Sequence, residues 1–176
     1  MAELRGKRIL VTGPAGQIAF PLARDLARHN EVWGIARFSQ PGSRERVEKA
    51  GISVAGVGLC APEWGQLPEH FDYVLHLAVF QQAGHDYDQA LRVNAEGTGL
   101  LMSRFRKARA CLVVSTCGVY ASPADPQHAI RESAPLGVTV QPYSPTYAVS
   151  KIAEEGDARF AAREWELPTT IARMNV

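Results

Sequence analysis

The chain lacks the features that mark secreted, metal-binding or membrane-spanning proteins. It has three cysteines among 176 residues, and Cys60, Cys111 and Cys117 show no metal-type spacing. We therefore expect no disulfide and no metal, with Cys111 acting as a small apolar core residue. No apolar run approaches the roughly 20 residues that span a bilayer, and the first residues do not resemble a signal peptide. These absences predict a cytoplasmic protein with no membrane partner.

The sequence also lacks an excess of charge of either sign. Lys and Arg total 19 and Asp and Glu total 18, so the formal net charge is +1. A balanced chain has no overall field to attract nucleic acid, so we expect a small-molecule partner and no nucleic-acid partner. Hydrophobic residues make up 46% of the chain, which excludes long disorder and allows one domain with a full core.

What is present is an alternation of short apolar runs and helical patterns. We expect strands at 8–12, 31–36, 52–57, 73–78, 110–115 and from 169 onward, and helices at 17–29, 43–50, 86–107 and 144–164. This alternation predicts βαβ units, and continuous apolar strands are typical of a parallel sheet buried on both faces. The predicted fold class is α/β, a Rossmann-type doubly wound parallel sheet with helices on both faces. The segment 121–143 is expected to be a long functional loop.

The first predicted strand leads into a glycine-rich turn with the spacing G-x-x-G-x-x-A. Gly13 permits a tight turn, Gly16 lets a diphosphate approach the backbone, and the following helix offers free N–H groups and a partial positive charge. An ordinary glycine turn is the alternative, but the position between a strand and a helix is the one that a dinucleotide site requires. We expect cofactor contacts from Gly13, Ala15, Gly16, Gln17 and Ile18.

The end of the second strand bears on the choice of cofactor. An acidic residue there binds the ribose 2′-hydroxyl of NAD, whereas an arginine accommodates the 2′-phosphate of NADP. This sequence has Arg37 and no carboxylate at that place, with Ser39 and Arg44 nearby as further donors. It therefore predicts NADP, with NAD as the alternative if Arg37 is only a solvated surface charge.

A tyrosine and a lysine lie one helical turn apart in the last predicted helix, at Tyr147 and Lys151, with Ser144 as the expected N-cap. An ammonium about 4 Å from a phenolate stabilises it by roughly 4 kcal/mol before desolvation. That is enough to lower the pKa of the phenol by about two units. Such a tyrosine can take a proton from a hydroxyl, or return one to a carbonyl, as hydride moves to or from nicotinamide. The spacing alone is common on helices, so a structural role is the alternative.

Together these segments resemble the extended short-chain dehydrogenase/reductase superfamily, the NAD-dependent epimerase/dehydratase family. The resemblance runs in order along nearly the whole chain. Its parts are the cofactor turn at 11–16, the fourth strand at 72–78, a long-helix motif at 93–98, a hydroxyl segment at 114–120, the pair Tyr147 and Lys151, and the segment 172–176.

The resemblance implies an NADP-dependent oxidoreductase, epimerase or dehydratase that acts by hydride transfer on a sugar nucleotide or a related hydroxyl or carbonyl compound. It makes Tyr147 the general acid or base. Lys151 would lower the pKa of that phenol and bond the nicotinamide ribose. Thr116 takes the position of the catalytic hydroxyl, with Ser115 as the alternative, because neighbours in a strand face opposite sides. A non-catalytic NAD(P)-binding sensor or scaffold is the alternative function, since a fold does not fix a function.

The same resemblance assigns further positions around the cofactor. The backbone of Leu77 and Ala78 is expected to line it. The family often has an acidic residue after the third strand, where this sequence has Leu59, so backbone groups there and Arg37 are expected to contact the adenine. His76 is expected to be a core histidine, and Asn94 to have a minor role in stabilising the long helix and its neighbouring loop. Gln81, Gln82, His85 and the 121–143 loop are expected to border the substrate.

Two expectations concern the whole molecule. Members of the family continue past the sixth strand into a substrate-binding portion, so residues 1–176 are expected to form the NAD(P)-binding domain, with that portion absent from this chain. Relatives often dimerise through two long helices, here 86–107 and 144–164. A homodimer through these helices is therefore possible, and packing of both on the sheet alone is the alternative.

Overall fold

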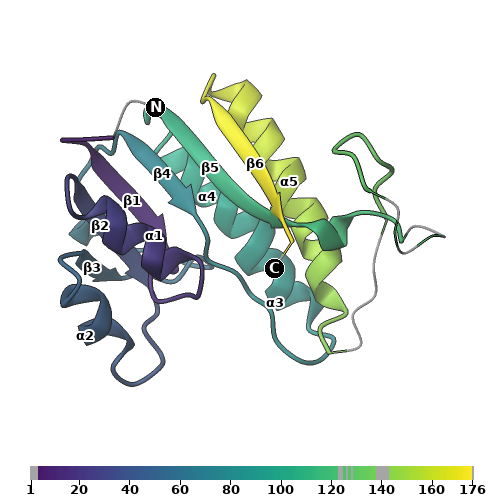
Figure 1. Cartoon of the computed structure of the whole chain (residues 1–176), viewed down its shortest axis with the longest axis horizontal. Helices are drawn as coiled ribbons and strands as arrows, with labels where there is room; N and C mark the ends of the chain where they lie inside the picture. The colour runs from purple at the N-terminus through teal and green to yellow at the C-terminus, as the bar shows by residue number, and fades with distance from the viewer. Residues whose placement is uncertain (1–3, 123–124, 126, 128, 138–142, 176) are drawn as a thin grey trace.

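The six apolar runs form one sheet with the strand order β3-β2-β1-β4-β5-β6, in which all neighbouring strands are parallel (Figure 1). The computed structural model describes residues 4–122, 125, 127, 129–137 and 143–175. The strands are β1 (Arg8–Thr12), β2 (Glu31–Ala36), β3 (Ser53–Gly56), β4 (Tyr73–His76), β5 (Ala110–Thr116) and β6 (Thr169–Met174). The predicted Rossmann-type α/β class is confirmed. The strand order reverses between β1 and β4, where open α/β sheets bind their ligands.

Helices cover both faces of the sheet (Figure 1). They are α1 (Ala19–Leu26), α2 (Ser43–Glu48), α3 (Tyr87–Leu91), the π-helical segment η2 (Arg92–Glu96), α4 (Gly97–Arg104) and α5 (Thr146–Glu164), with short 3₁₀ turns η1 (Trp64–Gln66) and η3 (Cys117–Val119). The helix predicted at 144–164 begins two residues later, and Ser144 makes no side-chain cap. In the described part of the chain, no helix is long and apolar enough to cross a membrane.

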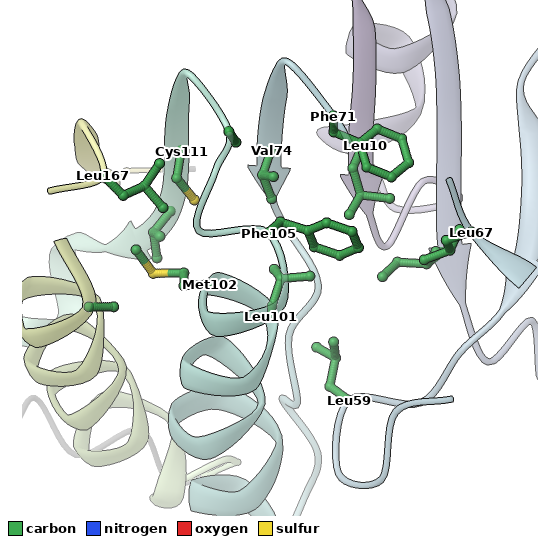
Figure 2. Packing of buried hydrophobic residues seen from close by; sticks show 14 of the residues in the cluster. Leu10, Leu59, Leu67, Phe71, Val74, Leu101, Met102, Phe105, Cys111 and Leu167 are labelled. Carbon is green, nitrogen blue, oxygen red and sulfur yellow. The ribbon is translucent and has the colours of Figure 1, made fainter. Parts of the chain in front are cut away.

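The core forms two layers because successive strand residues face opposite sides of the sheet. Ile9 and Val11 of β1 pack with Ala19 and Ala23 of α1. Leu10, between them, belongs to the layer under α4 and α5. Figure 2 shows this second layer, in which the rings of Phe71 and Phe105 meet edge to face with centroids 5.3 Å apart. Cys111 lies in the same layer, as predicted, and all three cysteines are free.

The long helix predicted at 86–107 is interrupted by the π-helical segment η2. Asn94 lies in this segment and is buried. Its side chain accepts from the N–H of Phe80 at 2.7 Å, and donates to the Phe80 carbonyl at 3.0 Å and to Ser150 Oγ at 2.9 Å. Asn94 therefore joins the loop after β4 to α5. The bonds to Phe80 agree with the expected support of the long helix and its neighbouring loop, and the bond to Ser150 goes beyond it. π-Turns often occur at functional sites.

The strand order reverses between β1 and β4, and there the buried hydroxyl of Thr12 bonds to the end of β4. Its Oγ1 accepts from the N–H of Leu77 at 3.0 Å and of Ala78 at 2.8 Å, and lies 2.8 Å from His76 Nδ1. On the other side of the ring, His76 Nε2 lies 2.8 Å from Thr98 Oγ1, which donates to the Asn94 carbonyl at 2.6 Å. Because Thr98 has given its proton away, His76 donates from Nε2, and Nδ1 is left to accept from Thr12. The predicted core histidine is confirmed.

Replacing this hydroxyl tests the arrangement. We expect Thr12→Val to lower the free energy of unfolding by about 3 kcal/mol, because two N–H groups and His76 Nδ1 lose their partner inside the protein. Urea unfolding measures the change. Thr170→Val, in β6 at an exposed position, is the matched control and should change stability little. Equal stability of the two variants would contradict the role of Thr12.

Candidate functional site

The turn between β1 and α1 requires glycine at Gly13. This residue has a φ of +66°, and a Cβ on it would lie 3.0 Å from the Cα of Ala78. Its N–H donates to the carbonyl of Ile35 at 2.8 Å. Both the left-handed backbone and the close approach of the β4 end therefore exclude a side chain here. The turn is held against β2 and β4 at the carboxyl edge of the sheet.

The rest of this turn presents free hydrogen-bond donors. Gly16 and Gln17 are exposed. Within the described residues, no hydrogen bond engages the N–H of Gln17 or Ile18, and Ile18 caps α1 without a side-chain bond. A helix start with open N–H groups and a partial positive charge suits an anion. These residues therefore fit the diphosphate of a dinucleotide.

Leu77 and Ala78 lie beside the turn, as the sequence predicted, but in a specific way. Their N–H groups are both taken by Thr12. The backbone of Ala78 also packs closest to Gly13. Only the carbonyls and side chains of these two residues are left to face a cofactor.

The two residues predicted near the adenosine differ in environment. Arg37 follows β2, is exposed, and makes no ion pair with any other described residue. Leu59 is buried in the core, and its Cβ packs so closely on Gly97 that a Cβ on Gly97 would lie 2.8 Å from it. The side chain of Leu59 therefore serves packing, and only its backbone is available to a ligand.

The structure separates the two adjacent hydroxyls at the end of β5. Ser115 is buried and donates to Glu155 Oε1 at 2.7 Å. Glu155 in turn accepts from Arg173 Nε at 2.8 Å and from Arg173 Nη2 at 2.6 Å. Thr116 faces the other way, where its Oγ1 accepts from the N–H of Gly118 at 3.1 Å and lies beside the phenol of Tyr147. Thr116 and Tyr147 are thus brought together, and Ser115 is not.

Lys151 does not take the position predicted for it. Its ammonium is buried, donates to the carbonyl of Val114 at 2.7 Å, and forms an ion pair with Glu154 of the same helix. Lys151 is not among the groups that act on the phenol of Tyr147 in this structure, so its predicted role in lowering that pKa stays a prediction. Burial raises that pKa, and the charges of Glu154 and Cys117 raise it further, against a lowering hydrogen bond from Thr116.

Glu154 is the site residue that the sequence did not indicate. It is fully buried between α5 and the sheet, and its Oε1 lies 3.6 Å from His76 Nε2. Desolvation raises the pKa of its carboxyl to about 7, although Lys151 opposes the rise. The only signal in the sequence is an acidic residue three positions after Lys151, a spacing that places both on one helix face.

An open cavity of about 1580 Å³ lies on the β5–β6 side of Tyr147. Its lining includes Thr116, Cys117 and Gln81 but not the phosphate turn, so it extends away from the diphosphate site. Gln82 and His85 do not line it. From the predicted loop, the lining residues are Ala121, Ser122, Ala129, Ile130 and Glu132, whereas residues 123–124, 126, 128 and 138–142 lie outside the described residues. Among the described side chains, no group of three His, Cys, Asp or Glu is arranged to hold a metal ion.

Comparison with known proteins identifies the family and the fold. The sequence profile described as the NAD dependent epimerase/dehydratase family matches residues 9–175. A search of curated protein sequences finds no significant match.

Solved structures with the same fold include two sugar-nucleotide epimerases and a dehydratase. UDP-N-acetylglucosamine 4-epimerase from Methanobrevibacter ruminantium superposes with a TM-score of 0.80 at 21% identity, covering 97% of this chain and 55% of its own. UDP-glucuronic acid 4-epimerase from Bacillus cereus, in complex with NAD, superposes with a TM-score of 0.77 at 24% identity. The match covers 94% of this chain and 56% of that protein. dTDP-glucose 4,6-dehydratase from Streptomyces venezuelae, with NAD bound, superposes with a TM-score of 0.75 at 25% identity. The match covers 94% of this chain and 55% of that protein. The chain thus spans little more than half the length of these proteins.

The buried histidine of the site gives the protein a measurable response to acid. Burial lowers the pKa of His76 to about 3, whereas an unfolded histidine takes up its proton near pH 6.5. The unfolded state therefore binds more protons between these two values, and the contribution of His76 to stability is lost as the pH falls from about 6.5 towards 3.

We expect the stability difference between the wild type and His76→Asn, measured by urea unfolding, to shrink as the pH is lowered from 7 to 4.5. Comparing two variants at each pH removes the contribution of the other carboxyl groups. His70→Asn, at an exposed position, is the matched control and should change the stability little. If the His76→Asn curve runs parallel to that of the wild type, the neutral buried state of His76 is refuted.

Proposed function

Since the chain belongs to the NAD-dependent epimerase/dehydratase family, which is a family of enzymes, we propose that it catalyses hydride transfer on a sugar nucleotide through a keto intermediate. The observation that carries this proposal is the meeting of Thr116 and Tyr147 at one end of the cavity, beside the switch point of the sheet. The solved structures named above are enzymes of UDP- or dTDP-linked sugars, which supports this substrate class. Whether the reaction is an epimerisation, a dehydration or a reduction follows from the substrate.

The cofactor site is proposed at the turn that begins α1. Gly13, Ala15, Gly16, Gln17 and Ile18 would hold the diphosphate, with Leu77 and Ala78 alongside. When bound, the nicotinamide supplies the hydride acceptor or donor. Leu59 contributes its backbone only, since its side chain lies in the core.

We propose NADP as the preferred cofactor, with NAD as the alternative. The exposed guanidinium of Arg37 at the end of β2 supports NADP, because it has no described ion-pair partner and suits a 2′-phosphate. The solved relatives with a named cofactor have NAD bound, which supports the alternative. Direct competition between the two cofactors decides.

The proton chemistry is proposed for Tyr147, with Thr116 orienting the reacting oxygen. Because the pKa of its phenol is raised, Tyr147 is protonated at neutral pH and ready to donate to a carbonyl oxygen. The Thr116 hydroxyl lies close enough to the phenol to share the same substrate oxygen. Removal of a proton from a hydroxyl needs a phenolate, and a positive charge near Tyr147 is what would stabilise one.

The assembly and the domain organisation remain predictions. Leu100 of α4 and Phe160 of α5 are 44% and 54% exposed, which supports a homodimer through these helices. The match covers 97% of this chain but 55% of the first solved structure named above, which supports a cofactor-binding domain over residues 1–176. The cytoplasmic location also stays a prediction.

Removal of the phenol hydroxyl tests the proposed reaction. We expect Tyr147→Phe in the full-length protein to lower turnover of UDP- or dTDP-sugars at least about 100-fold, because the proton donor is lost. Cofactor affinity should change little. Products are followed by NMR over a panel of substrates, and Tyr143→Phe, exposed and four residues earlier, is the control. Undiminished turnover would remove Tyr147 from the mechanism. Cofactor binding without turnover of any substrate by the wild type would favour the sensor or scaffold.

Removal of the arginine tests the choice of cofactor. We expect Arg37→Ala to weaken NADP binding about 10- to 100-fold, the usual loss for a hydrogen bond to a charged group, and to leave NAD binding nearly unchanged. Titration calorimetry with each cofactor measures both. Arg106→Ala, at an exposed position near the amino edge of the sheet, is the control. A wild-type protein that clearly prefers NAD would contradict the proposal.

A further inference from the structure

A buried ion pair joins the last helix to the last strand of the sheet. Glu155 of α5 is 2% exposed, and the side chain of Arg173 in β6 is 13% exposed. Arg173 donates from Nε to Glu155 Oε1 at 2.8 Å and from Nη2 to Glu155 Oε2 at 2.6 Å. Two bonds of this kind fix the plane of the guanidinium as well as its position.

The pair makes three further contacts, and all of them are with the end of β5 and the chain that follows it. Ser115 Oγ donates to Glu155 Oε1 at 2.7 Å. Arg173 Nη1 donates to the carbonyl of Glu132 at 3.1 Å, and its Cζ lies 4.7 Å from the centre of the Tyr120 ring. A buried ion pair is weak evidence for stability, because both charges give up their hydration. The directions of these contacts indicate that this pair fixes the geometry of one segment.

The register of the sheet explains how one pair reaches that segment. Ser115 of β5 stands opposite Arg173 of β6, so their side chains point to the same face of the sheet. This is the face on which α5 supplies Glu155. Thr116, the next residue of β5, points to the other side and is left free of the pair.

The candidate catalytic hydroxyl thus lies between two contacts of the pair, at Ser115 before it and at Tyr120 after it. The turn between them is η3. Its N–H of Gly118 donates to Thr116 Oγ1 at 3.1 Å, and the N–H of Tyr120 donates to the Cys117 carbonyl at 3.1 Å. Both internal bonds of the turn span only two or three residues, so the position of the turn depends on what holds its ends.

The same guanidinium fixes the segment that pairs with this turn. Tyr120 forms an antiparallel bridge with Leu136, and the N–H of Gly137 donates to the carbonyl of Val119 at 3.0 Å. The bond from Arg173 to the Glu132 carbonyl holds this segment from its other end. Tyr120 and Glu132 both line the cavity beside Thr116, so Arg173 joins two parts of the cavity wall.

We propose that Arg173 is a positioning residue for Thr116. Together with Glu155 it holds the chain on both sides of Thr116, and so fixes where the hydroxyl lies in the cavity. The consequence for catalysis rests on the proposed function, because it requires Thr116 to orient the reacting oxygen of a substrate. The geometric part does not, since every contact named above exists in the protein without a ligand.

The geometric part is tested by amide hydrogen exchange, followed by NMR in the protein without cofactor or substrate. Arg173→Lys keeps the charge but loses the planar fork that reaches several partners at once. We expect the N–H groups of Gly118, Ala121 and Gly137 to exchange at least about 10-fold faster, the factor for one lost hydrogen bond to a charged group. No acceleration there overturns the proposal. An equal acceleration at Cys111, at the other end of β5, shows a general loss of stability and also overturns it.

A matched control is available on the same helix. Arg159 Nη2 also lies near the Glu155 carboxylate, at 3.7 Å, but its side chain is 56% exposed. Arg159→Lys makes the same chemical change and should leave the exchange of the turn as it is, because an exposed contact of this kind contributes little. A rise of the same size in this variant overturns the proposal.

A smaller change covers the case in which Arg173→Lys does not fold. Ser115→Ala removes the contact before Thr116 and leaves the ion pair whole. We expect the Gly118 N–H to exchange about 10-fold faster in this variant, since a hydrogen bond to a carboxylate is lost. An unchanged rate contradicts the proposal.

The consequence for catalysis is tested in the full-length protein by combining two variants. Arg173→Lys should lower kcat about 10-fold or more, because a misplaced orienting group is costly. In a Thr116→Val background it should lower kcat no further, because the hydroxyl that it positions is gone. A further fall of the same size in the double variant overturns the link to Thr116. Absence of turnover by the wild type counts against the proposed function, and the exchange rates decide the geometric part without it.

Discussion

The hydroxyl of Thr12 is the point on which the site depends. At the place where the strand order reverses, this one oxygen accepts two N–H groups from the end of β4 and gives its own proton to His76. The end of β4 is thereby held against Gly13, whose left-handed backbone shapes the phosphate turn. The Thr98 hydroxyl on the other side of the ring sets the tautomer of His76, and burial lowers its pKa and keeps the ring neutral. Because the ring is neutral, the buried carboxylate of Glu154 forms its ion pair with Lys151. The geometry of the phosphate turn and the electrostatics of the catalytic helix are therefore joined through one strand end.

Much of this arrangement follows from the sequence, because its causes are local. Apolar runs that alternate with helical patterns dictate a parallel sheet, and a glycine turn between the first strand and helix dictates where an anion fits. The fine placement of side chains depends on distant partners that no local pattern reveals. The resemblance favours Thr116 over its neighbour Ser115, but the physical reason lies elsewhere in the chain. Ser115 is bonded to Glu155, 40 residues later, with Arg173 behind it. The π-helical segment η2 has a similar origin, since Asn94 is committed to Phe80 and Ser150 outside its own helix.

The spacing of Tyr147 and Lys151 does not by itself decide which neighbour the ammonium contacts. A tyrosine and a lysine four residues apart share a helix face, and this alone suggests that the ammonium serves the phenol. The competing carboxylate of Glu154 is three residues from the same lysine, and spacing does not rank the two partners. Burial ranks them, because an ammonium removed from water requires a full opposite charge, which a neutral phenol does not provide. The Val114 carbonyl completes the inward arrangement.

A tyrosine kept protonated has a preferred direction of use. It is suited to giving a proton to a carbonyl oxygen as hydride arrives, and poorly suited to taking one from a hydroxyl. An epimerisation through a keto intermediate requires both steps on the same oxygen in turn. An epimerase that used Tyr147 in this way would need positive charge near the phenol in one half of the cycle and less of it in the other. The pKa of Glu154 lies at about 7, so the carboxyl that opposes Lys151 gains or loses its proton close to neutrality.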